Sequence, residues 1–95
     1  MKQFMILHVG FERPTPEIME QWNDWFAKTA SCTIDMGGFM GGRERNKSGS
    51  QELGWDENCL TGYSIIEAES LEAAEEIAST NPFITAIRIY EIRKQ

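Results

Sequence analysis

The sequence has little of what metal, disulfide and nucleic-acid sites usually require. It contains one histidine and two cysteines, and Cys32 and Cys59 stand far apart without a CxxC or Cys/His spacing. This arrangement indicates no metal site and favours two reduced thiols. Basic residues number 9 against 15 acidic ones, which gives a net charge of -6. Because phosphate binding needs a basic surface, nucleic acid is a poor candidate partner.

Long apolar runs are absent as well. A membrane span needs roughly 20 apolar residues, and no stretch of this chain approaches that length. The N-terminal run Met1–Val9 is too short for a signal peptide and has no small-residue cleavage site after it. We therefore expect a cytoplasmic protein without a membrane segment. Since no phosphate loop or Ser/His/Asp order is present, we also expect no bound cofactor.

What the sequence does contain is the composition of one folded domain over residues 1–95. Hydrophobic residues make up 41% and charged residues 25%, which are ordinary values for a globular protein. A chain of this size buries only about 60–65% of its unfolded surface. Association with a second copy is the usual remedy, so the length alone favours a homodimer.

Hydrophobic periodicity predicts four strands and two helices. The strands are expected at residues 4–9, 33–40, 60–67 and 87–92. The helices are expected to begin after Thr15 and Ser70, whose side chains can cap them. The resulting βαββαβ order predicts a ferredoxin-like α+β fold, with an antiparallel four-stranded sheet and both helices on one face. The polar residues 41–58 read as a loop of unusual length, either functional or mobile.

Apolar side chains mark the buried face of each helix and both faces of the sheet. The first helix carries a stripe that includes Trp22 and Trp25, and we expect both tryptophans in the core. The other stripe members of the two helices are Ile18, Met19, Phe26, Ala30, Leu71, Ala74, Ile77 and Ala78. Because the helices cover one sheet face only, the second face predicts a sheet supplied by another subunit.

Several segments resemble the YCII-related (DGPF-type) family. They are MKQFMILHVG, PEIMEQWNDWF, GGFMGG and, most specifically, GYSIIEAESLEAAEEIASTNPF. The resemblance covers nearly the whole chain and implies a dimeric α/β-barrel fold, in a superfamily that includes small monooxygenases, muconolactone isomerases and dehydrochlorinases. Some relatives carry a catalytic His near the start of the first helix, where this chain has Thr15–Met19. The Asp-Gly-Pro-Phe motif is absent too, so the resemblance transfers no His–Asp mechanism.

His8 is the candidate acid/base residue. It is the one histidine, and no other side chain titrates near neutral pH without a large environmental shift. The alternative interpretation is a half-buried structural histidine on a central strand. Asp35 is the candidate carboxylate to orient His8, although nothing in the sequence shows that the two meet.

Four aromatic residues are candidates for ligand binding. Phe4 shares a strand face with His8 and can form an apolar wall, Tyr63 can offer a phenol, Trp55 can cover a pocket, and Trp22 can line one if it is not core. Two functions stay open. The first is binding or transforming a small apolar or aromatic molecule without a cofactor. The second is a non-catalytic homodimeric interaction or regulatory module.

Overall fold

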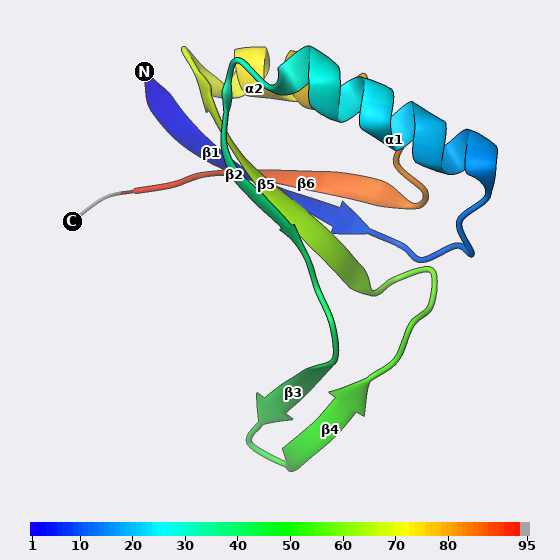
Figure 1. Ribbon diagram of the computed structural model, residues 1–95. Helices are drawn as coiled ribbons and strands as arrows, with labels where there is room; N and C mark the ends of the chain where they lie inside the picture. Colours follow the sequence, from blue (N-terminus) through cyan, green and yellow to red (C-terminus); the bar gives the residue numbers. More distant parts are fainter. Residues whose placement is uncertain (94–95) are drawn as a thin grey trace.

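The computed structural model describes residues 1–93 and has an α+β fold (Figure 1). Its elements in chain order are β1 (Lys2–Val9), α1 (Pro16–Thr29), β2 (Thr33–Gly38), β3 (Gly42–Asn46), β4 (Gly49–Leu53), β5 (Leu60–Ala68), α2 (Leu71–Ala78) and β6 (Ala86–Glu91). Neither helix in the described part of the chain has the length and apolarity that a membrane crossing needs.

The main sheet confirms the predicted ferredoxin-like fold. Its four strands run in the order β2-β5-β1-β6, and each neighbouring pair is antiparallel. Both helices lie on one face of this sheet (Figure 1). The two central strands, β1 and β5, pair with Phe4 opposite Ile66 and His8 opposite Gly62.

Both helices begin where their capping residues predict. The Thr15 hydroxyl accepts a hydrogen bond from the backbone N–H of Ile18 at 3.2 Å, and Pro16 occupies the first turn. The Ser70 hydroxyl accepts from the N–H of Ala73 at 3.1 Å in the same way. These caps satisfy donors that a helix start would otherwise leave open.

The core lies between the helices and the inner face of the sheet. Phe4, Ile6 and Ile66 are fully buried there, against Trp25 of α1 and two alanines of α2. Trp22 differs from the prediction, because it is only half-buried and packs at the margin of this core. Met19, Ala30 and Leu71, also expected in the buried stripes, are exposed.

Residues 41–58 are not the unstructured loop that their polarity predicts. They include a two-stranded hairpin, β3–β4, which we call the arm and which projects away from the main sheet (Figure 1). Asn46 and Gly49 close the hairpin, and the Asn46 side chain accepts from the N–H of Ser48 at 2.9 Å. Gly49 has a φ of 137°, a backbone angle that side-chain-bearing residues rarely adopt.

The two tryptophans of α1 should differ in their effect on stability. Trp25 is 2% exposed and donates from Nε1 to the Thr80 hydroxyl at 2.9 Å. Trp25→Ala should lower the free energy of unfolding by about 3–5 kcal/mol, because it leaves a large cavity in the core. Trp22→Ala should lower it by less than about 2 kcal/mol. Denaturant unfolding followed by circular dichroism tests this, and equal losses would contradict the assignment of Trp25 to the core.

Candidate functional site

His8 lies near the end of β1, on the face that the helices cover. Side chains alternate along a strand, so His8 shares this face with Phe4 and Ile6. Its side chain is 8% exposed. The residue opposite on β5 is Gly62, where a Cβ atom would lie only 2.8 Å from the carbonyl oxygen of Gly37. Glycine at this position therefore allows β2 and β5 to approach closely beside the histidine.

Two polar side chains hold the imidazole of His8. The side-chain nitrogen of Asn81 lies 3.2 Å from Nδ1, and the Ser64 hydroxyl lies 3.5 Å from Nε2. An amide NH₂ can only donate, so Nδ1 accepts and the ring proton sits on Nε2. The contact from Nε2 to Ser64 is at the outer limit of hydrogen-bond length. Nε2 is therefore the more weakly held edge of the ring.

Asn81 itself carries an unpaired buried group. The residue is 4% exposed, and its Oδ1 has no hydrogen-bond partner among the described residues. Leaving a buried acceptor unpaired costs about 1–3 kcal/mol. The polar cluster of His8, Ser64 and Asn81 is therefore an unfavourable arrangement for stability alone, which makes it a candidate functional group of residues.

Aromatic rings surround the imidazole on the helix side. Trp22 and Trp25 both meet His8 edge-to-face, with ring centroids 5.1 Å and 6.2 Å away. In these surroundings burial disfavours the charged imidazolium and lowers the pKa of His8 from 6.5 to about 4. His8 is therefore neutral at neutral pH, and it offers one N–H donor rather than a positive charge.

His8 lines a cavity of about 340 Å³, which we call the His8 cavity. Trp22 and Phe26 of α1 form its helix side, and Thr61 to Tyr63 of β5 form its sheet side. The remaining wall comes from β2, through Met36, Gly37 and Gly38. Met36 is 44% exposed, so this side of the cavity meets solvent. The cavity is thus apolar and aromatic, with a neutral histidine as its main polar group.

The structure does not bring Asp35 to His8. Asp35 accepts a hydrogen bond from the Tyr63 hydroxyl at 2.9 Å, and this bond raises the pKa of Tyr63. Tyr63 alternates along β5 with the inward-facing Gly62 and Ser64, so its ring points to the opposite face of the sheet. There it stacks on Phe39, with ring centroids 5.8 Å apart. The orienting position beside His8 belongs to Asn81 instead.

The four predicted ligand-binding aromatics separate into different places. Trp22 lines the His8 cavity, and Tyr63 borders it from β5, although the Tyr63 ring stacks on Phe39 at the opposite face. Phe4 is fully buried in the core, and Trp55 lies outside this cavity. Sequence reasoning missed Ser64 and Asn81 altogether. Asn81 carried one signal, the Asn-Pro step that ends α2, but that signal describes a helix boundary rather than a contact with His8.

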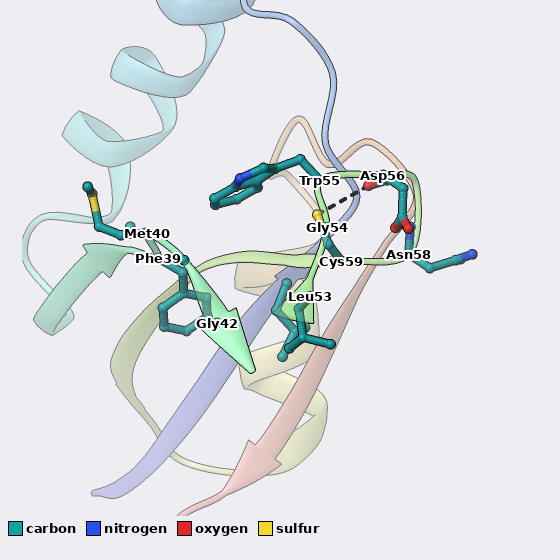
Figure 2. Close-up of a pocket in the computed structure, with 12 residues that line it drawn as sticks. Phe39, Met40, Gly42, Leu53, Gly54, Trp55, Asp56, Asn58 and Cys59 are labelled. Atoms are coloured by element: carbon teal, nitrogen blue, oxygen red, sulfur yellow. Dashed lines mark hydrogen bonds between the residues drawn. The ribbon is translucent and has the colours of Figure 1, made fainter. Parts of the chain in front are cut away.

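Trp55 lines a second, larger cleft of about 530 Å³ at the base of the arm, which we call the arm cleft. Figure 2 shows Phe39, Leu53 and Trp55 among the side chains around it. The thiol of Cys59 donates to the backbone carbonyl of Asp56 at 3.2 Å beside this cleft. Both cysteines are free, and no three acidic, histidine or cysteine side chains gather as a metal site within residues 1–93.

Comparison with known proteins finds the fold but no family. No family model matches the chain, and no curated protein sequence matches it. Among solved structures, the chain is similar to 5-chloro-2-hydroxyhydroquinone dehydrochlorinase from Burkholderia phenoliruptrix AC1100, solved in complex with 2,5-dihydroxybenzoquinone. The superposition has a TM-score of 0.55 and covers 98% of this chain and 95% of that one. The sequence identity is 13%, so the likeness concerns the fold.

The burial of His8 predicts a pH dependence of stability. Below pH 6.5 the unfolded chain takes up a proton on His8 that the folded chain excludes until pH falls to about 4. Stability should therefore fall as pH drops through this window, by about 3 kcal/mol in full. The His8→Asn variant should lack this part of the loss. Denaturant unfolding at a series of pH values measures it.

A variant with a carboxylate in place of the Asn81 amide, next to His8 in space, provides the matched control. In Asn81→Asp, a negative charge faces Nδ1 and stabilises the imidazolium, so the pKa of His8 should rise and the loss should shrink. Since His8 is the one histidine, an NMR titration of its ring reports the pKa directly. A parent imidazole that titrates near 6.5 would show that burial does not act on it.

Proposed function

We propose that the His8 cavity binds a small, flat, largely apolar molecule such as a single aromatic ring with an oxygen substituent. The proposal rests on one observation, a buried, neutral histidine on the wall of an aromatic cavity. The volume of this cavity, about 340 Å³, lies at the lower end of the range for ligand pockets, roughly 300–1,000 Å³. A ligand of one ring fits that size better than a nucleotide or a peptide.

The side chains around the His8 cavity indicate which chemical groups a ligand should carry. Trp22 and Phe26 offer ring faces and edges, which favour another aromatic ring. The weak contact of Nε2–H with Ser64 is easily exchanged for a bond to a ligand oxygen. An anionic oxygen there would raise the pKa of His8 and let it take up a proton. His8 is thus the residue that would hold a proton in any reaction, with Asn81 as its positioning residue.

We infer membership of the YCII-related family as part of this proposal. The fold supports it, and so do the residues Gly62–Ala74, which resemble that family most specifically. The similar solved structure was obtained with a dihydroxybenzoquinone bound, a molecule of the size and shape proposed here. Asp35 does not orient His8 in this proposal, because its carboxylate accepts a hydrogen bond from Tyr63 instead.

Binding can be tested with a panel of phenols, aromatic acids and lactones. We expect at least one compound to bind the parent, and His8→Asn and Met36→Trp to weaken it by about tenfold or more, which corresponds to about 1.4 kcal/mol. A tryptophan at the exposed Met36 would fill the cavity without disturbing the core. Met19→Trp is the matched control, since Met19 is exposed on α1 and outside the cavity. If both cavity variants bind the compound as tightly as the parent does, the binding proposal is wrong and His8 is a structural residue.

We further propose that the chain is a homodimer, as the alternative role of an interaction module also requires. The outer face of the main sheet carries Met5, Leu7 and Ile65, with Tyr90 paired opposite Met5. No helix covers this face in the described chain (Figure 1). Burying it against a second sheet would remove these apolar side chains from water, with Arg88 opposite Leu7 and Asp35 opposite Ile65 on the two edge strands.

Light scattering should give the mass of a dimer at micromolar concentration. Tyr90→Lys should weaken the dimer, because it places a charge within the proposed contact, beside Met5 of the central strand β1. Tyr90 is 55% exposed in the single chain, so the substitution itself should leave the fold intact. Met19→Lys adds the same charge on α1 and should have no effect. A parent of monomer mass would refute the homodimer but not the His8 cavity.

A further inference from the structure

The chain exposes more surface than a compact monomer of its mass. Its solvent-accessible area is 7037 Å², whereas a monomer of 10.9 kDa is expected to expose about 5,600 Å². The radius of gyration is 14.4 Å, against about 12.4 Å for a compact domain of this length. The excess of about 1,400 Å² is larger than the roughly 800 Å² that each partner contributes to a stable interface.

Much of this excess comes from the arm. β3 and β4 form a sheet of their own, and every residue in them except Gly49 is exposed. A two-stranded hairpin by itself is marginally stable in water and needs packing on one face. The one ion pair within it, between Arg43 and Glu52 at 3.8 Å, is exposed and contributes little. The arm therefore lacks a source of stability within its own chain.

Exposed apolar side chains gather where the arm joins the body. Met40 is 85% exposed, and Leu53 and Trp55 are each 48% exposed. With Phe39 and Leu60 they line the arm cleft (Figure 2). Few of the residues around this cleft are charged, and an apolar centre of this kind is typical of the core of a protein interface.

The arm cleft is continuous with the outer face of the main sheet. Phe39 stacks on Tyr63, which belongs to that face, and the N–H of Phe39 bonds to the carbonyl oxygen of Thr61 at 2.9 Å. A surface that covers the sheet face would therefore reach the cleft without a gap. The partner proposed for the sheet face, a second copy of this chain, is the occupant that this continuity favours.

Charge also fits a second copy. The arm carries Arg43, Arg45 and Lys47 with two glutamates, so residues 42–53 have a net charge of +1. The rest of the chain then has a net charge of -7. Two whole copies repel each other, but the arm of one is attracted to the body of the other.

We propose that the arm and arm cleft of each copy clasp a second copy of this chain. The apolar cleft at the base of the arm forms the centre of this contact, and the charged residues along the arm form the rim. This inference rests on the proposed homodimer and adds a second contact to the sheet face. Because the contact is the same on both copies, each arm holds the other subunit around a twofold axis.

The test uses the full chain and one exposed methionine. Met40→Lys should weaken the dimer by about tenfold or more in sedimentation equilibrium, because it places a charge at the apolar centre. In the single chain Met40 is almost free of contacts, so the fold should be unchanged by circular dichroism. Met19→Lys makes the same substitution on α1 and should match the parent. Amide exchange in residues 42–53 should slow as protein concentration rises through the dimer midpoint.

The outcomes separate the proposals. A dimer that Met40→Lys leaves unchanged, with arm amides that exchange at the same rate at every concentration, would overturn the arm contact and keep the sheet-face dimer. A monomeric parent would overturn both, and the arm cleft would then belong to another occupant. Neither result overturns ligand binding in the His8 cavity, which is measured with separate variants.

Discussion

The two central strands bury alternate side chains beneath the helices, and the rest of the structure depends on their register. β1 and β5 pair so that Phe4 lies opposite Ile66 and His8 opposite Gly62. A shift of one residue would move all of these side chains to the other face. The large side chains of Phe4, Ile6 and Ile66, all fully buried, make that shift costly, because each would exchange a packed site for water. The position of His8 is therefore fixed by the packing of its apolar neighbours.

The same burial makes His8 unusual. An imidazole on a solvent-facing strand would titrate near 6.5, but between Trp22, Trp25 and the sheet its pKa is lowered to about 4. The neutral ring keeps Asn81 and Ser64 as polar partners in an otherwise apolar region, and the amide oxygen of Asn81 has no partner there among the described residues. Such a polar cluster beside a cavity is the kind of local conflict with stability that functional sites contain.

Sequence patterns predicted the main sheet and both helices because their signals are local. Caps, Pro16 and period-2 alternation act over a few residues, and the structure uses each of them. The arm was missed because its strands consist of glycine and polar or charged residues and contain one apolar side chain, Leu53. Its strands are joined by the turn at Asn46–Gly49, and no buried face marks them as strands in the sequence.

The site was harder to predict than the fold, because it depends on pairing across the chain. Asp35 and His8 both lie on strands, but register and face decide whether they meet, and neither is visible in a single sequence. Asp35 pairs opposite Ile65 on β5 and reaches Tyr63. Asn81 is 73 residues away from His8 along the chain. Whether Asn81 reaches His8 depends on where the chain after α2 lies over the sheet, and no local sequence pattern specifies that.

The His8 cavity and the arm cleft share part of their walls. Gly38 lines both of them, and the next residue, Phe39, leads into the arm. A second copy that holds the arm would therefore also restrict the β2 side of the His8 cavity. Restricting a pocket wall before a ligand arrives reduces the ordering that binding must bring about, which strengthens binding without any new ligand contact. If two copies associate through the arm as proposed, association and occupation of the His8 cavity would act on the same short segment of β2.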